Sequence, residues 1–256
     1  MLENFFLPLF PSDDSRILTL MIFTFFVAGL IKGFLGIGLP AVGVGVLTLV
    51  LSPTHAMSLL VIPIIFTNLS QFVRCKYPVE SIKKYWVLAL TILISIFITS
   101  VFLSKYPVGF LTISIGVAMI FVSLNGLFGF RMRTGPSPCW QVGFGLLSGV
   151  LGGLSAIWSP PITMYLISRG INKDQFISAT GFLFLVGSFP LAIGLFLGGI
   201  LNQKIIFQSI FGLVIVLFGF YVGEGLGRSI SQKRFEMAVY FAFFCMGLRL
   251  IAVGLF

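Results

Sequence analysis

Two stretches of this sequence decide its fold: KGFLGIGLPAVGVG at residues 32–45 and GVLGGLSAIWSPP at residues 149–161. Each stretch places several glycines just before a proline in otherwise apolar sequence. Proline removes a backbone donor and clashes with the preceding helical turn, and glycine weakens a helix, yet proline suits the first turn of a new helix. We therefore predict a broken helix in each stretch, unwound at Gly36–Leu39 and at Ser155–Ser159.

Most of the chain is apolar enough to lie in lipid. Of its 256 residues, 58% are hydrophobic and 9% are charged, and the mean hydropathy is +1.12. About a quarter of the residues in a typical soluble domain are charged. Apolar runs of about 20 residues, the length that spans a bilayer core, recur along the sequence, and no polar stretch is long enough for a separate soluble domain. This composition argues against an enzyme with an aqueous catalytic module, and we predict no catalytic residues.

The charge and the cysteines exclude further classes. The formal net charge is +9, but the basic residues lie in short loops between apolar runs, where they orient a membrane protein. We therefore predict no nucleic-acid binding. Cys75, Cys139 and Cys245 are scattered and odd in number, which indicates neither a disulfide framework nor a metal site. We predict no metal and no cofactor.

The chain repeats itself at an offset of 120 residues without a gap. Gly29, Gly33, Ile37, Pro40 and Ser58 fall on Gly149, Gly153, Ile157, Pro160 and Ser178. Internal duplication of this kind is common in secondary transporters. We predict two repeats, residues 1–130 with a broken helix at 17–51 and residues 131–256 with a broken helix at 139–169, each broken helix being followed by three transmembrane helices.

The two repeats are parallel if each crosses the membrane four times, and inverted if each broken helix is a re-entrant hairpin. The parallel arrangement divides the basic residues almost evenly between the two sides. The inverted arrangement leaves Arg16, Lys105 and Lys204 on one side and gathers eleven on the other: Arg74, Lys76, Lys83, Lys84, Arg131, Arg133, Arg169, Lys173, Arg228, Lys233 and Arg234. Cytoplasmic loops carry the excess of lysine and arginine, so we favour inverted repeats with both termini outside. The second half-helices, Pro40–Leu51 and Pro160–Arg169, are too short to span at about 1.5 Å per residue, although Ile17–Leu35 is long enough to span alone.

Inverted hairpins would point the N-termini of both second half-helices at the bilayer midplane. A helix N-terminus offers unpaired N–H groups and about half a positive charge, which favours an anion. Lys32 lies one turn before Gly36, and a cation within an apolar segment is functional by default. Asn68 and Gln71 share one face of the next segment, Ser159 is placed to cap the second half-helix, and Arg249 is the other cation within an apolar run. The predicted substrate-binding residues are Lys32, Gly36, Gly38, Pro40, Asn68, Gln71, Ser155, Trp158, Ser159, Pro160 and Arg249.

The acidic residues fall in or near predicted loops and helix ends. They are Glu3, Asp13, Asp14, Glu80, Asp174, Glu224 and Glu236. A core without carboxylates has no obvious cation site or carboxylate proton relay. Together with Lys32 and the positive helix ends, this favours an anionic solute.

The glycine-rich segment ending in proline, which in the second copy reads GGLSAIWSPPITMYLISRGINKDQF at residues 152–176, resembles the TauE/SafE family of sulfite exporters. The resemblance covers nearly the whole chain, including its length, its two copies and the break in each. It implies a bacterial inner-membrane permease that exports sulfite, sulfoacetate or related organosulfur anions. The chain departs from the family pattern at Ala156 and Trp158, where small glycines are common, and these departures bear on the size of the substrate.

We therefore expect a multi-pass secondary transporter that exports a small anion by alternating access, with the lipid bilayer as its surroundings and no nucleic-acid partner. A homodimer is compatible with the sequence. Two alternatives stay open: a passive anion channel, and a membrane enzyme that acts on a lipid phosphate. Such an enzyme would need acidic metal ligands or a general acid–base near the breaks.

Overall fold

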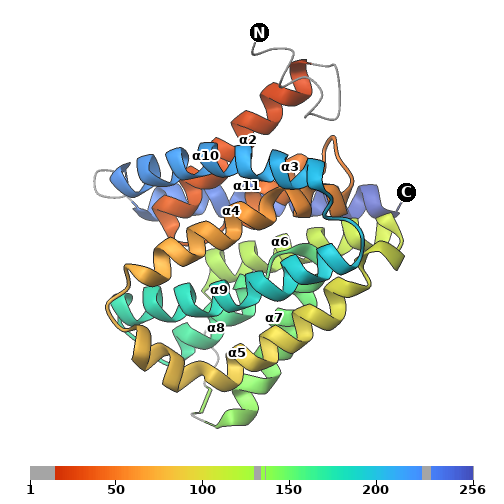
Figure 1. Cartoon of the computed structure of the whole chain (residues 1–256). Helices are drawn as coiled ribbons and strands as arrows, with labels where there is room; N and C mark the ends of the chain where they lie inside the picture. Colours follow the sequence, from red (N-terminus) through yellow and green to blue (C-terminus); the bar gives the residue numbers. More distant parts are fainter. Residues whose placement is uncertain (1–14, 130–133, 136, 227–231, 256) are drawn as a thin grey trace.

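The computed structural model describes residues 15–129, 134, 135, 137–226 and 232–255, with the backbone alone described at 15, 16 and 232–235, and these residues are almost entirely helical (Figure 1). The predicted boundary between the repeats, at 130 and 131, lies outside the described residues, as do both termini, Arg131, Arg133 and Arg228. In chain order the helices are α2 (Ser15–Leu35), α3 (Leu39–Leu47), α4 (Pro53–Val73), α5 (Pro78–Val101), η2 (Leu103–Lys105), α6 (Val108–Phe128), α7 (Pro138–Ser155), α8 (Ser159–Ser168), α9 (Lys173–Leu197), α10 (Gln203–Leu226) and α11 (Gln232–Leu255).

Seven of the described helices are long and apolar enough to cross a membrane: α2, α4, α5 with η2, α6, α9, α10 and α11. The short helices α3 and α8 have 9 and 10 residues. At about 1.5 Å per residue they cannot cross a core of about 30 Å. Helix α7, with 18 residues, is not among the seven. The predicted all-helical membrane protein is confirmed at this level.

The first broken helix lies where its glycines and proline predicted it. Helix α2 ends at Leu35 and α3 begins at Leu39, and between them Gly36 and Gly38 have left-handed φ angles of 75° and 98°. Helix α3 begins one residue earlier than predicted, with Pro40 in its first turn. It ends at Leu47 instead of Leu51, because the Thr48 hydroxyl donates to the Val44 and Gly45 carbonyls and satisfies the last turn.

The second broken helix also lies where it was predicted, but its cap differs. Helix α7 ends at Ser155 and α8 begins at Ser159, and Ala156 between them has φ 59°. The prediction that Ser159 caps α8 is wrong: Trp158 occupies the cap position, and no side chain makes a capping bond. Helix α8 begins one residue earlier than predicted, so Ser159 is its first residue and not its cap. With Trp158 at the cap, the second and third residues of the helix are Pro160 and Pro161, which have no N–H for a capping side chain to bond.

Helix α3 turns back beside the helix that follows it. Its first residues share a pocket with Thr67 and Asn68 of α4, whereas a Cβ added at Gly43 would lie 2.5 Å from Leu60 Cδ1. The two helices therefore run antiparallel. Helix α2 in turn runs parallel to α10, because Gly29 lies against Val216 and Gly33 against Phe220, which leaves no room for a Cβ at either glycine.

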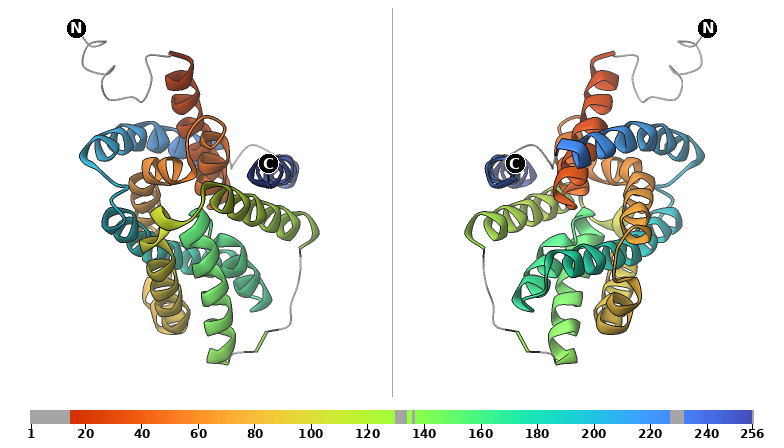
Figure 2. Two further views of the ribbon diagram at one scale, coloured as in Figure 1. Left: turned by 90° about the vertical axis from the view of Figure 1, so that its right-hand side faces the viewer. Right: turned by 90° about the vertical axis from the view of Figure 1, so that its left-hand side faces the viewer.

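A similar contact occurs at the offset of 120 residues, between α7 and α5. Gly149 of α7 lies against Ser95 and Ile96 of α5, and Gly145 lies against Thr91, so these two helices also run parallel. Figure 2 shows α2 and α7 entering from opposite ends of the molecule, with their breaks near its centre.

The two helices that follow the breaks, α4 and α9, form the centre of the molecule. Each is 61% buried over its apolar window, compared with 22% for α11. They run antiparallel, since Gln71 donates to the Ile177 carbonyl while Ile64 shares a pocket with Phe184. Helices α6 and α11 form a second antiparallel pair, in which Gly116 lies against Gly247 and Gly109 against Gly254.

Alanine at Gly38 is expected to destabilise the protein by about 1–3 kcal/mol, because a residue with a Cβ is strained at φ 98°. The new Cβ would also lie 3.3 Å from Ile31 Cγ2. Thermal unfolding in detergent measures the effect. Gly143→Ala is the control, because this glycine lies within α7 with open space around it. Equal melting temperatures for the two variants would contradict the prediction.

Candidate functional site

Lys32 lies in the last turn of α2, one turn before the first break. Its side chain is 2% exposed, and its Nζ lies 2.8 Å from each of three oxygens: the Gly36 carbonyl, Asn68 Oδ1 and Gln71 Oε1. An ammonium group has three N–H donors, so each donor has a partner. All three partners are neutral, and none of them compensates the buried charge.

The broken helix is what gives Lys32 its backbone partner. In a continuous helix the Gly36 carbonyl would accept from the N–H four residues later. That residue is Pro40, which has no N–H. The carbonyl is thus left for Lys32, whose side chain reaches it across one turn.

Gln71 connects Lys32 to the second half of the chain. Its Nε2 donates to the Ile177 carbonyl at 3.2 Å and to Thr180 Oγ1 at 3.1 Å, both on α9. These bonds fix the amide so that its oxygen faces Lys32. The Phe184 ring, also on α9, lies 5.3 Å from Lys32 Nζ and adds a cation–π contact.

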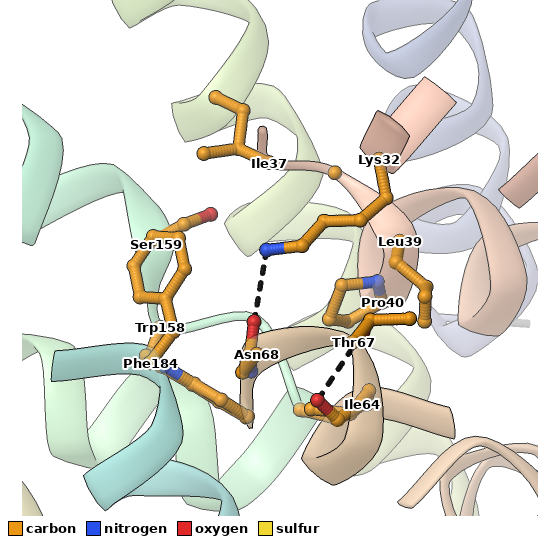
Figure 3. A pocket seen from close by; sticks show the side chains of 12 residues that line it. Lys32, Ile37, Leu39, Pro40, Ile64, Thr67, Asn68, Trp158, Ser159 and Phe184 are labelled. Atoms are coloured by element: carbon orange, nitrogen blue, oxygen red, sulfur yellow. Dashed lines mark hydrogen bonds between the residues drawn. The ribbon is translucent and has the colours of Figure 1, made fainter. Parts of the chain in front are cut away.

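Two cavities meet at Lys32. The smaller one, which we call the inner pocket, lies between the two breaks and has a volume of about 20 Å³, room for about one water molecule. It is lined by Lys32, Ile37, Gly38, Leu39, Pro40, Ile64, Thr67, Asn68, Ala156, Trp158, Ser159 and Phe184 (Figure 3). The larger one, which we call the vestibule, has a volume of about 740 Å³ and shares Lys32, Ile37 and Ser159 with the inner pocket.

The vestibule extends to the end of the molecule where α4 and α10 finish and α9 begins. Its lining there includes Arg74, Lys173 and Glu224. The Arg74 guanidinium donates to both Glu224 carboxylate oxygens, at 2.9 and 3.0 Å. These bonds raise the pKa of Arg74 above its usual value, so the side chain stays charged. The vestibule thus leads from a charged mouth to the buried lysine.

Helices α3 and α8 both begin at the inner pocket, which is lined by Gly38, Leu39 and Pro40 from one start and by Trp158 and Ser159 from the other. Each helix therefore directs its positive end at this space. The prolines, however, remove N–H donors from both first turns, two of them in α8. The ends of α3 and α8 therefore contribute mainly partial positive charge to the pocket and few hydrogen-bond donors.

The structure brings together nine of the eleven residues predicted to bind substrate. The exceptions are Ser155 and Arg249, which line neither cavity. Ser155 is buried, and its hydroxyl donates to the Leu151 carbonyl and accepts from the Ile157 N–H, so it stabilises the break. Arg249 is exposed on α11. The nine residues that line the inner pocket or the vestibule are Lys32, Gly36, Gly38, Pro40, Asn68, Gln71, Trp158, Ser159 and Pro160.

Several lining residues were not predicted from the sequence. Ile64 and Phe184, which lie in α4 and α9, both line the inner pocket. They are counterparts at the offset of 120, but they are different apolar residues, so neither the repeat nor their polarity marks them as pocket residues. Thr180, which lines the vestibule, is not marked by the repeat either, because its counterpart is Leu60.

The comparison with protein families identifies the family of this chain. A family described as "Sulfite exporter TauE/SafE" matches residues 21–250, almost the whole chain. The chain belongs to the TauE/SafE family. No curated protein and no solved structure gives a significant match. Membership of the TauE/SafE family, together with the seven apolar helices, makes this chain a multi-pass membrane protein of an anion-exporter family, as the sequence resemblance implied.

Ser155→Ala is expected to lower the stability of the protein by about 1–3 kcal/mol, because it leaves the buried Ile157 N–H without its acceptor. Thermal unfolding in detergent is the measurement. Ser114→Ala is the control, since the Ser114 hydroxyl only donates to the Phe110 carbonyl within α6. If Ser155→Ala melts at the wild-type temperature, its hydroxyl does not hold the break.

Proposed function

We propose that this TauE/SafE chain is a secondary transporter that exports a small anion, with Lys32 as the cation that binds it. The observation that carries the proposal is the buried ammonium, which has three neutral partners and borders both cavities. A buried charge is costly unless it is compensated. An anion that replaces one or more of the three oxygens supplies the missing negative charge.

The substrate is a small sulfur anion, sulfite or an organosulfonate such as sulfoacetate. The family description supports sulfite. The site adds support of its own: Ser159 and Asn68 are polar groups beside Lys32 that can hydrogen-bond to sulfur oxyanions, and two helix N-termini face the same space. Gly36, Gly38, Pro40, Gln71, Trp158 and Pro160 complete the proposed site.

The two repeats, residues 1–130 and 131–256, are inverted, and each broken helix is a re-entrant hairpin. Helix directions support this. Helices α2, α4 and α10 run one way, since Ser209 of α10 bonds to Leu59 of α4 and Glu224 pairs with Arg74. Helices α5, α7 and α9 run the other way, so α2, α4 and α5 each oppose their counterparts α7, α9 and α10. The return of α3 along α4 supports a hairpin.

Transport proceeds by alternating access, and not through a continuous pore. The vestibule reaches Lys32 from the end where Arg74 and Lys173 lie, and the inner pocket beyond it has room for about one water molecule. This closed arrangement favours a carrier over a passive channel. Counterflow separates the two: unlabelled sulfite trapped in vesicles drives uphill uptake of labelled sulfite through a carrier, whereas a channel gives no uphill phase.

Lys32→Met is expected to reduce sulfite flux in proteoliposomes at least about tenfold, because hydrogen bonds to a charged group contribute about 1.5–3 kcal/mol. Arg249→Met is the matched control, since Arg249 is a cation in an apolar helix but itself lines neither cavity. The amount of protein reconstituted into vesicles is measured for both. Wild-type flux through Lys32→Met would refute the role of Lys32.

Single cysteines at Lys83, Lys173 and Lys204 test the inverted repeats, because all three side chains are exposed. In a background lacking Cys75, Cys139 and Cys245, a membrane-impermeant maleimide should label positions 83 and 173 from the cytoplasmic side. Position 204 should react from the outer side. Labelling of 83 and 173 from opposite sides would support parallel repeats instead.

A further inference from the structure

The two repeats differ at several of the positions that line the inner pocket. At the offset of 120, the counterpart of Lys32 is Gly152 and the counterpart of Gly38 is Trp158. The scaffold around them is alike in both halves, since the Gly29–Val216 contact corresponds to the Gly149–Ile96 contact. The second repeat therefore has a tryptophan at its break where the first has a glycine, and no cation where the first has Lys32.

Trp158 takes the space that a side chain at position 152 would need. A Cβ added at Gly152 would lie 2.7 Å from Trp158 Cβ and 3.2 Å from its Cε3. On its other side the indole lies against Gly187, where a Cβ would be 3.1 Å from Trp158 Nε1. Gly187 is the counterpart of Thr67, and Trp158 is 3% exposed. Gly152 and Gly187 thus leave room for the indole, whereas the corresponding positions of the first repeat carry the polar side chains of Lys32 and Thr67.

The inner pocket therefore has a cation, Lys32, on one side and aromatic rings on the other. Figure 3 shows Lys32 on one side of the inner pocket and Trp158, Ser159 and Phe184 on the other. Lys32 is the only charged residue among those that line it. A second negative charge brought into this space would be buried beside aromatic rings without a partner, which is costly.

We propose that Trp158 sets the specificity of this site: by filling the position that corresponds to Lys32, it restricts the substrate to a singly charged anion and limits its length. The negative end of the anion contacts Lys32 and its uncharged end faces Trp158. This inference rests on the proposed function and narrows it. It favours hydrogen sulfite and short alkanesulfonates over sulfoacetate and sulfate, which carry two negative charges.

The first test compares anions on the wild-type protein. Binding is measured as the rise in melting temperature that each anion causes in detergent over a range of concentrations, since a ligand of the folded state stabilises it by an amount that grows with the logarithm of its concentration over its Kd. Transport is measured as competition with labelled sulfite in proteoliposomes. Methanesulfonate is expected to bind and compete at least about tenfold better than sulfate or sulfoacetate. Equal or better binding of the doubly charged anions would overturn the proposal.

The second test changes the indole. Trp158→Ala is expected to raise the preference for butanesulfonate over methanesulfonate at least about tenfold, because it opens apolar space for the longer chain. Phe25→Ala is the matched control: this ring is 1% exposed, packs on Gly212 between α2 and α10, and lines neither cavity. Trp158→Phe keeps an aromatic ring and is the variant to measure if Trp158→Ala does not fold. It should change the preference for butanesulfonate in the same direction by a smaller factor.

The outcomes separate this inference from the proposed function. If wild-type protein binds and transports methanesulfonate but the variants at Trp158 leave the chain-length preference unchanged, Trp158 does not set the specificity and the anion transporter stands. If no anion in the series stabilises or is transported by the wild-type protein, both proposals fail.

A third test looks for a gain of function in the double variant Gly152→Lys with Trp158→Gly. A second cation in the space that the indole leaves should improve sulfate binding at least about tenfold relative to Trp158→Gly alone.

Discussion

The ammonium group of Lys32 is the interaction on which the rest of the site depends. A charge 2% exposed within an apolar helical protein needs three acceptors in one place. A regular helix cannot supply a backbone acceptor there, because its carbonyls are already bonded. The break at Gly36 and the missing N–H of Pro40 release one carbonyl, and α4 contributes two amide oxygens. The glycine and proline that interrupt the helix therefore help to hold the Lys32 side chain as well as to determine the fold.

The same network extends the effect of that charge across the molecule. Gln71 bonds to Lys32 through its oxygen and to α9 through its nitrogen, so one amide joins the two central helices. Any movement of the lysine toward an anion would change its bond to Gln71, the side chain that also bonds to α9 in the second half of the chain. A carrier needs such a connection between its occupied site and the helices that rearrange.

The sequence predicted the breaks well because glycine and proline act locally. Glycine permits the left-handed backbone angles found at Gly36 and Gly38, and the absence of an N–H on proline follows from residue type alone. Proximity of Asn68 and Gln71 to Lys32 depends on how α4 packs against α2, and periodicity shows only that the two amides share a face. The capping role expected of Ser159 was wrong because α8 begins at Ser159 itself, so that Trp158 takes the cap position. Arg249 could not be placed from sequence, because an apolar run does not tell which of its faces meets lipid.

The proposed duplication accounts for the residues in which the two halves agree and for those in which they differ. Glycines that let helices approach closely are repeated, such as Gly29 and Gly149, because each half needs the same packing. Several residues that face the inner pocket are free of that constraint and differ: lysine against glycine, and glycine against tryptophan. A symmetric scaffold can exchange between two related arrangements, since each half adopts the conformation of the other. A single central site does not need two cations, and two lysines facing each other across about one water molecule's space would repel. The glycine at 152, with the indole that covers it, removes that repulsion while it keeps the pocket filled.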